Sequence, residues 1–446
     1  MEVLRHCLPP SVRRTLDELP ESLDETYLRV LKEIKKPNRD HALRVLQCLV
    51  VAIRPLRVEE LAEVLAVNFD DEEGMPKLNP NWRWDNQEQA LLSSCSSLIA
   101  IVKSKRSRIV QFSHFSVKEF LTSDRLASSS GDISRYHIDF EPAHTILAQA
   151  CLSVLLLSEN RVEETGIRNS SPLAGYAAER WVVHAQDGKV SSCLRKAMEY
   201  LFDVGKPYFA AWLELHDLDT RPPRGSTFFM LHFYQNLNSS GTPLYYAARC
   251  GFQDLVEHLI AKDPKQVTAE GGWYLTPFVV ALGMGHFLTT KFLHDKGAHP
   301  DVKGHKEYTP LHSAVIHGDS GMVQVLLEYK ADVHARVHDA NTPLHLTAGY
   351  VYRGRINPLS MSNIARLLLE HGADVNARNN KQSTPLHLAS RFWMVEVVHV
   401  LLEHGADVGA EDEDGDTALQ VVSNERRDEL MELLSKHGAR LGENTN

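Results

Sequence analysis

The chain has few cysteines and no long apolar run. Each of its six cysteines lies more than 40 residues from the next, and none forms a Cys-x-x-Cys pair. Neither a disulfide framework nor a cysteine-based zinc site is therefore indicated. No stretch approaches the roughly 18 consecutive apolar residues of a membrane helix, and the first ten residues, MEVLRHCLPP, contain no apolar signal segment. We therefore expect an intracellular protein without a membrane association, cytoplasmic with the nucleus left open.

The chain also lacks the motifs of the common hydrolases. Its two Gly-Lys pairs are followed by Val190 and Pro207, where a phosphate loop would have serine or threonine. No Gly-x-Ser-x-Gly nucleophile motif is present. The histidine pairs at 312 and 317 and at 334 and 338 have no acidic or cysteine companion suited to a metal site. We expect no catalytic residue, no cofactor and no metal, and hence a protein that is not an enzyme.

Positive charge is not in excess either. The chain has 48 basic and 58 acidic residues, a net charge of −10. This balance disfavours general binding to nucleic acids or anionic membranes. With 446 residues, 43% of them apolar and 24% charged, the chain has the composition of a globular protein of two to four domains.

What the chain does have is a motif that recurs through its second half. Threonine followed by proline, or by alanine in the last copy, occurs at positions 242, 276, 309, 342, 384 and 417. Three copies continue as Thr-Pro-Leu-His, and Gly-Ala-Asp follows a leucine-rich segment at 372 and 405. Threonine caps a helix start, and proline suits the first helical position because its missing N–H has no helical partner there. Glycine supplies the positive φ that ends a helix, so the pattern predicts stacked pairs of short helices.

This motif and its period of about 33 residues resemble the ankyrin repeat. The resemblance implies about six repeats over residues 228–446, with a first capping helix at 228–237. It also accounts for much of the high histidine count of 23. For His312, His345 and His387 it implies a structural hydrogen bond, whereas His371, His404 and His437 precede the glycine that ends a helix, where a cation is favoured.

Several repeats depart from the motif. The fourth has about nine extra residues within 349–361, and these are basic and aromatic. The insert is either a tolerated surface loop or a partner contact. Glycine is absent from most of the hairpin turns, where Tyr274, Glu307, Ala340 and Gln382 replace it. We therefore expect the hairpin tips, called fingers below, to deviate in shape from the ankyrin pattern.

The resemblance also implies which residues contact a partner, because ankyrin repeats bind through their fingers and first helices. Trp393 stands where the motif has glycine, so it is either an exposed anchor or a residue packed against the next repeat. Phe392 and Trp393 are the two residues that we most expect to contact a partner. Aligned on the motif, the following first-helix residues are expected to be exposed: Arg249, Cys250, Ile316, His317, Arg391 and Phe392. The full set of predicted protein-binding residues is Arg249, Ile316, His317, Tyr350, Tyr352, Arg353, Arg355, Arg391, Phe392 and Trp393.

The first half is predicted to be helical with one hairpin. Amphipathic patterns indicate helices at 16–34, 40–53, 57–67, 87–95 and 116–121, and strands at 98–103 and 108–113. This order is the topology of a winged helix. The predicted fold is mainly α, with a helical remnant at 1–36, a winged-helix domain with a small β-hairpin at 37–127, a helical spacer at 140–220 and the ankyrin α-solenoid at 228–446.

The segments LPESLDETYLRVL, RPLRVEELAEVLAV and VQFSHFSVKEFLTS are similar to the region that follows the nucleotide-binding NACHT module in fungal NLR-like proteins. The same region resembles the winged helix named after GPI inositol-deacylase, although the chain lacks the serine motif of that chemistry. By this resemblance, the chain is similar to the C-terminal part of such an architecture. It is either a truncated gene product or a protein that has lost the nucleotide-binding module.

The function we expect is a non-catalytic scaffold or sensor that binds a protein of unknown identity. The resemblance implies the regulatory and ligand-sensing end of an NLR-like protein, acting on a NACHT module only in trans. The alternative is nucleic-acid binding through a basic wing formed by Lys103, Lys105, Arg106 and Arg108. The helix at 87–95 offers no basic side chain to read bases, which disfavours this alternative.

Overall fold

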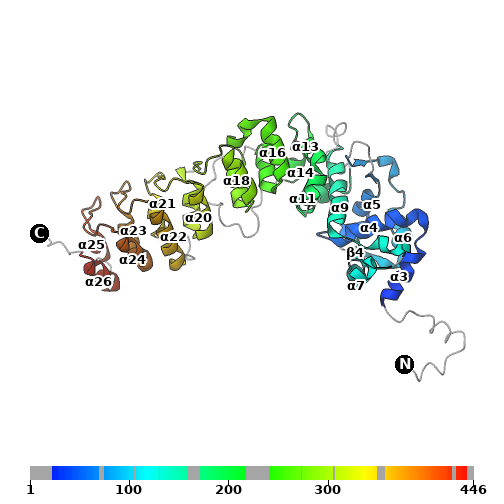
Figure 1. The fold of residues 1–446 in the computed structure, drawn as a ribbon, viewed down its shortest axis with the longest axis horizontal. Coiled ribbons are helices and arrows are strands. Elements are labelled where there is room, and N and C mark those ends of the chain that lie inside the picture. The colour runs from blue at the N-terminus through cyan, green and yellow to red at the C-terminus, as the bar shows by residue number, and fades with distance from the viewer. Residues whose placement is uncertain are drawn as a thin grey trace, which may run out of the picture. The chain divides into compact units, whose positions relative to one another are not determined.

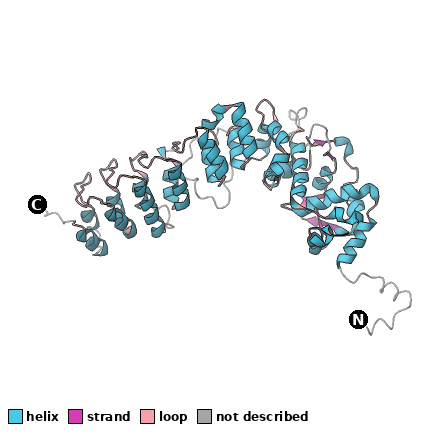
Figure 2. Ribbon diagram, viewed as in Figure 1, coloured by secondary structure: helices cyan, strands magenta, loops and turns pink. Residues whose placement is uncertain are grey.

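In the computed structural model, the described residues are 23–69, 75–104, 107–129, 131–157, 171–187, 189–216, 241–272, 274–304, 307–348, 357–423 and 428–438. The chain divides into two compact units, Met1–Asp217 and Leu218–Asn446. Most of the described residues are helical, and the few strands lie in the first unit (Figure 2). The predicted fold class, mainly α with a small antiparallel sheet, is confirmed.

The first unit begins with short helices and a small sheet. Amphipathic α4 (Arg39–Val51) buries a face that includes Val45, Leu46 and Val50, and α5 (Val58–Val64) buries Leu61. Tyr27 on the first helix hydrogen-bonds to Ser116 on α7 at 2.8 Å, which ties the start of the unit to the helix that follows the hairpin. The helices are α3 (Leu23–Glu33), α4 (Arg39–Val51), α5 (Val58–Val64), α6 (Gln87–Cys95), α7 (Phe115–Leu121) and α8 (Asp124–Ala127), with short 3-10 turns η1 (Lys36–Asn38), η2 (Pro80–Trp82), η3 (Ser96–Leu98) and η4 (Gly131–Tyr136).

The sheet has one strand more than the sequence predicts. Strands β4 (Ile99–Ser104) and β5 (Ser107–Phe112) form the expected hairpin, with Ile101 opposite Val110. A third strand, β1 (Leu56–Arg57), pairs with the free edge of β5, so the order is β1-β5-β4. The predicted helix at 57–67 is therefore wrong at both ends. Arg57 is in β1 because its backbone pairs with Ile109, and Val67 lies in β2 (Val67–Asn68), which pairs with β3 (Lys77–Leu78).

A helical layer follows within the same unit. Its long helix α9 (Phe140–Leu155) packs against α11 (Ala174–Ala185) and α4. Trp181 on α11 lies edge-on to Trp212, whose indole N–H donates to the carbonyl of Ala178 at 3.1 Å. These aromatic rings form the layer's core. The remaining helices are α12 (Val190–Cys193), α13 (Arg195–Leu201) and α14 (Tyr208–Leu215).

The second unit is a row of helix pairs, and Figure 1 shows the second helix of each later pair lying on the same side of the array. In the first five pairs the first helix starts at the proline after the repeated threonine, because the threonine caps the helix and proline suits its first position. In the sixth pair, alanine follows the threonine and begins the helix. The predicted helix at 228–237 lies outside the described residues. Six pairs are described: α15 (Pro243–Cys250) and α16 (Gln253–Lys262), α17 (Pro277–Gly283) and α18 (Phe287–Asp295), α19 (Pro310–His317) and α20 (Ser320–Glu328), α21 (Pro343–Thr347) and α22 (Pro358–Glu370), α23 (Pro385–Arg391) and α24 (Val395–Glu403), and α25 (Ala418–Ser423) and α26 (Asp428–Lys436), with a 3-10 turn η6 (Pro264–Thr268) after α16.

Candidate protein-interaction surface

The fingers that join successive helix pairs share one backbone turn. Gly304, Val337, Asn379 and Asp412 each donate a backbone hydrogen bond to the carbonyl four residues later, at 2.8, 3.1, 3.1 and 3.0 Å. In these fingers the residue three positions after the donor has a positive φ: 64° at Glu307, 57° at Ala340, 55° at Gln382 and 80° at Gly415. Its own N–H makes the second hydrogen bond of the turn, back to the carbonyl of the donor residue, at 2.7–3.1 Å.

The expectation that fingers without glycine change shape is therefore wrong for Glu307, Ala340 and Gln382. The turn's two hydrogen bonds hold the left-handed conformation even though each side chain disfavours it. The finger at Tyr274 does deviate, because its positive φ values fall on Gly272 and Leu275 instead.

Two of the three motif histidines, His345 and His387, link the start of a helix to the next finger. In His345 the Nδ1 atom accepts the backbone N–H of Thr342 at 3.2 Å, and Nε2 donates to the carbonyl of Ser383 in the next finger at 3.1 Å. His387 makes the same two bonds to Thr384 and Asp416, both at 3.1 Å. Burial lowers the pKa of His345 to about 4, against the opposing hydrogen bond to Ser383, so the ring is neutral at physiological pH.

His312 starts its helix in the same way, with Nδ1 accepting the N–H of Thr309 at 3.2 Å. The histidines at the other helix ends also have structural bonds. His371, His404 and His437 each lie within 3.0 Å of the carbonyl four residues earlier, through Nδ1. The structural role that the ankyrin resemblance implies for these histidines is therefore visible in their hydrogen bonds.

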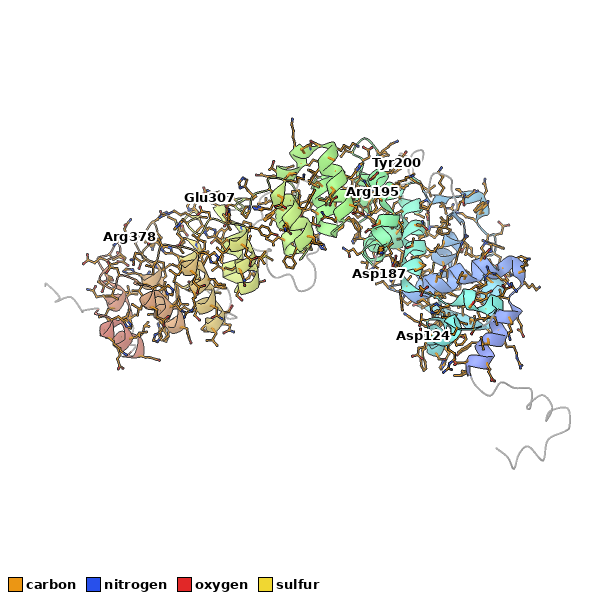
Figure 3. All side chains as sticks on the ribbon, in the orientation of Figure 1. Asp124, Asp187, Arg195, Tyr200, Glu307 and Arg378 are labelled. Atoms are coloured by element: carbon orange, nitrogen blue, oxygen red, sulfur yellow. The ribbon has the colours of Figure 1, made fainter. Side chains whose placement is uncertain are left out.

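Two arginines link adjacent fingers into one edge. Arg336 donates to the carbonyl of Arg378 at 3.0 Å, and Arg378 donates to the carbonyl of Glu411 at 2.8 Å. Backbone bonds add to the link, since the N–H of Glu413 reaches the carbonyl of Lys381 at 3.0 Å. Glu307 and Arg378, both labelled in Figure 3, lie along this edge of the array. The motif did not reveal this role of the arginines, although their identical place in successive repeats was a usable signal.

Two of the predicted binding residues are buried. Arg249 is only 9% exposed and Ile316 only 7% exposed. The guanidinium of Arg249 lies over the ring of Tyr274, 5.7 Å from its centre. The expectation that Arg249, Cys250 and Ile316 present exposed side chains is therefore wrong, because the following repeat covers the end of each first helix. His317 is half-buried, with its Nδ1 2.8 Å from the carbonyl of Ser313.

Phe392 and Trp393 differ from these residues. They are 45% and 44% exposed, two neighbouring aromatic rings at the turn between α23 and α24. The adjacent Arg391 is half-buried, and its guanidinium lies 3.7 Å from the carboxylate of buried Asp412 in the next finger. We call Phe392 and Trp393 the aromatic pair. Whether these residues bind a partner stays a prediction.

Trp393 also has an unusual backbone conformation. Its φ of 63° matches those of Gly251, Gly285 and Gly318, which are 73°, 77° and 69° at the same turn of other repeats. The residue after each of them donates to the carbonyl five residues earlier, at 2.9–3.1 Å, and Met394 does so to Ala389 at 3.0 Å. A non-glycine residue in the left-handed region costs about 1–2 kcal/mol, so this repeat holds a large aromatic side chain at a position that disfavours it.

Four other predicted contact residues belong to the insert of the fourth repeat. Tyr350, Tyr352, Arg353 and Arg355 lie outside the described residues, as do Lys105 and Arg106 of the predicted basic wing. Of that wing, Lys103 is exposed, while the guanidinium of Arg108 is paired with Glu88 of α6. This pairing places an acidic side chain beside the wing, which weakens the nucleic-acid alternative.

Within the described ranges, no group of three or more histidine, cysteine and carboxylate residues is placed to hold a metal ion. Nor does any helix in those ranges have the length and apolar character needed to cross a membrane. An open groove lies between α20 and α22, lined by residues such as Gln324 and Arg366. Leu367 is the only large apolar residue among those that line this groove, so it offers no aromatic anchor comparable to the aromatic pair.

Comparison with known families agrees with this architecture. Residues 30–131 match the family described as "GPI inositol-deacylase, winged helix domain". Four overlapping segments, 244–337, 278–379, 334–412 and 357–445, match "Ankyrin repeats (3 copies)". The chain thus contains a winged-helix domain of this type followed by ankyrin repeats, as predicted.

Among curated proteins, the chain is 31% identical over 300 residues to "Azaphilone pigments biosynthesis cluster protein L" of Monascus ruber, an alignment that covers 64% of this chain and 61% of that protein. It is 39% identical over 104 residues to "Ankyrin repeat and SAM domain-containing protein 6" of Mus musculus, covering 23% and 12%. It is 29% identical over 119 residues to "Transient receptor potential cation channel subfamily A member 1 homolog" of Caenorhabditis elegans, covering 26% and 10%. The chain therefore aligns with less than two thirds of each of these relatives. The ankyrin repeats support a role in protein interaction.

Proposed function

We propose that this chain is a non-catalytic protein-binding scaffold whose principal contact is the aromatic pair, Phe392 and Trp393. The observation that carries the proposal is the exposure of two adjacent aromatic rings at a turn where three other repeats have glycine. Exposed aromatic side chains are frequent energetic anchors of protein interfaces. The hydrogen bond from the N–H of Met394 to the carbonyl of Ala389, at 3.0 Å, holds the backbone of this turn. A partner that binds there therefore loses little affinity to ordering of the backbone.

The chemistry of the pair indicates the kind of partner. Aromatic rings bind best where they enter an apolar pocket that excludes water. Arg391 lies next to the pair, and its partner Asp412 is buried, so the charge at the base of this surface is already balanced. We therefore expect a partner that presents an apolar pocket, with charge contributing mainly at the rim.

The resemblance to NLR-like proteins supports a more specific proposal. In such an architecture the winged helix controls a nucleotide-binding module and the repeats sense a ligand. We propose that this chain acts inside the cell as the sensing and regulatory part of such a system, with a NACHT module supplied by another chain. Co-purification of a NACHT protein with the full-length chain is the expected result, and its consistent absence under conditions that recover other partners contradicts this proposal.

Affinity capture with three forms of the full chain tests the binding surface. The forms are the wild type, the double variant Phe392→Ser with Trp393→Asn, and a control with Phe287→Ser and Leu288→Ser at the start of α18. Asparagine is used at 393 because it tolerates the left-handed conformation. Both control side chains are exposed and apolar. We expect one or more proteins to be recovered with the wild type and the control and lost with the aromatic variant. Recovery of the same proteins by all three forms contradicts the proposal.

A further inference from the structure

A chain of hydrogen bonds crosses the first unit from the winged helix to the helical layer. The backbone N–H of Ile53, just after α4, lies 3.4 Å from the hydroxyl of Tyr176 on α11. That hydroxyl lies 2.8 Å from Nε2 of His184. The Nδ1 atoms of His184 and of His144 on α9 are 2.8 Å apart. Nε2 of His144 lies 3.1 Å from the carboxylate of Asp187, which is labelled in Figure 3.

The positions of the protons in this series of hydrogen bonds follow from the groups near its two ends, Asp187 and Tyr176. A carboxylate only accepts, so Nε2 of His144 carries hydrogen toward Asp187. If His144 is neutral, its Nδ1 is bare and must accept from Nδ1–H of His184. The Nε2 atom of a neutral His184 is then bare as well, and accepts the hydroxyl hydrogen of Tyr176. Every donor and acceptor is used when both rings are neutral.

One additional proton breaks this pattern at either ring. A proton on Nδ1 of His144 places two N–H groups face to face at a separation of 2.8 Å. A proton on Nε2 of His184 opposes the hydroxyl hydrogen of Tyr176, whose oxygen already accepts the N–H of Ile53. His184 is 0% exposed, so water does not replace the lost bond.

The surrounding groups also disfavour the additional proton. Burial, with smaller contributions from His144 and Arg180, lowers the pKa of His184 to about 4. Burial lowers the pKa of His144 too, with Asp187 opposing and Lys118 of α7 adding to the effect. Around Tyr176, burial and the thiols of Cys151 on α9 and Cys48 on α4 raise the pKa of the phenol, against the N–H of Ile53 and the guanidinium of Arg54, so its hydrogen remains in place.

The charged groups near the far end of the chain are paired. Arg54 lies over the ring of Tyr176, 4.8 Å from its centre, and makes two 2.8 Å bonds to the carboxylate of Glu60 on α5. The guanidinium of Arg57 lies 2.9 Å from the same carboxylate, so this group has no excess negative charge to offset a positive charge on His184.

We propose that this series of hydrogen bonds, from Ile53 to Asp187, is an acid-sensitive latch. Protonation of His144 or His184 releases α11 from α9 and from the end of α4. Because the imidazoles bind a proton more weakly in the latched form than in the open form, latching is fully stabilised above pH 6.5. That stability is lost as the pH falls from 6.5 toward 4, where the latched His184 also titrates. The population of the open form should rise by about tenfold or more between pH 7.4 and 5.0.

Hydrogen exchange followed by mass spectrometry on the full chain measures this opening. After correction for the intrinsic pH dependence of exchange, we expect amides of α11 to exchange about tenfold faster at pH 5.0 than at pH 7.4. Amides of α6, in the same unit, should change less than about twofold. Equal acceleration of α6 and α11, or no acceleration of α11, overturns the proposal.

A variant pair separates the latch from general acid destabilisation. His144→Asn with His184→Gln replaces both rings by amides that do not titrate, and it should abolish the acid response of α11. His41→Gln is the matched control. Burial and, to a smaller extent, Arg44 lower the pKa of this α4 histidine, with Asp40 opposing them, but His41 is not one of the residues in the hydrogen-bond series. It should keep the full response. If the double variant does not fold, Tyr176→Phe removes the opposing hydroxyl and should reduce the response; a wild-type response in either latch variant overturns the proposal.

Discussion

Buried polar groups are satisfied differently in the two units. In the repeat unit, buried His345 and His387 bond to the threonine three residues earlier and to the next finger. In the first unit, Glu63 bonds to Arg83 and to Ser171, 108 residues away. The repeat unit thus satisfies its polar groups by a local rule applied again in each copy, whereas the first unit depends on single contacts between distant segments. A lost contact should therefore cost more in the first unit.

The largest expected effect is on the first unit. Glu60 is fully buried and accepts hydrogen bonds from Arg54 and from the backbone of Arg57. Burial opposes its ionisation, but these bonds outweigh burial and keep the pKa of Glu60 below its usual value. Glu60→Ala should destabilise the unit by about 3 kcal/mol, because Arg54 loses its partner beside the buried ring of Tyr176. Hydrogen-exchange protection of α4 and α5 measures the loss.

The control for this change lies in the repeat unit. Glu403 pairs with Arg366 across exposed faces of α24 and α22 at 3.3 Å. Glu403→Ala should leave protection unchanged within error, because exposed ion pairs contribute little. Equal losses for Glu60→Ala and Glu403→Ala would contradict the expectation that the buried pair of the first unit contributes more than the exposed pair of the repeat unit.

A somewhat smaller effect is expected from acid on the repeat unit. The folded pKa of His345, about 4, lies below the usual 6.5. Its stabilising contribution is therefore present above pH 6.5 and lost as the pH falls toward 4, by about 2–3 kcal/mol at pH 4.5. His345→Gln should reduce this acid loss while keeping the cap, since Gln420 already accepts the N–H of Thr417 at 2.7 Å in the last repeat.

Exchange protection of α22 at pH 7.0 and 4.5 measures the effect of His345→Gln. The last repeat provides the internal reference, because Gln420 there does not titrate. An unchanged acid loss in the variant would show that the motif histidine does not set the pH dependence of its repeat.

The smallest effect concerns the fingers. Gln382 has a φ of 55° and an exposed side chain. Gln382→Gly should stabilise the repeat unit by about 0.5–1 kcal/mol, because glycine adopts this conformation without the penalty of a side chain. Thermal unfolding of the variant and of Gln382→Ala, which should not gain stability, checks the prediction. A loss of stability on Gln382→Gly would mean that the side chain contributes more than the backbone conformation costs.

The same difference between the units decides how much the sequence could predict. The period of Thr-Pro pairs predicted the helix pairs and the threonine caps, because each rests on residues a few positions apart. A structural hydrogen bond at the motif histidines was implied by the ankyrin resemblance, but their partners in the next finger, 38 and 29 residues away, were not. The period could not predict the burial of Arg249 and Ile316, which depends on how closely the next repeat packs. Nor could it predict the shape of fingers at Glu307 and Ala340, where hydrogen bonding overrides the preference of the side chain.

In the first unit the amphipathic patterns predicted α6 and the hairpin well. They could not predict β1, which exists because two residues happen to meet the edge of β5. The His144–His184 contact was also invisible, because it joins positions 40 residues apart on two helices with no shared motif. The repeat alignment predicted the exposure of Phe392 and left Trp393 as either exposed or packed against the next repeat; both are about half exposed. The left-handed backbone of Trp393 follows from the glycine position that it occupies.

The most direct test of the account is the affinity of a captured partner for the full chain and for the Phe392→Ser, Trp393→Asn variant. Isothermal titration calorimetry at pH 7.4 should show a loss of about 30-fold or more, the effect of removing about 2 kcal/mol at an interface anchor. Exchange protection of α24 and α26 in the variant should show that the repeats remain folded. Unchanged affinity in a folded variant would contradict the claim that the aromatic pair is the binding surface.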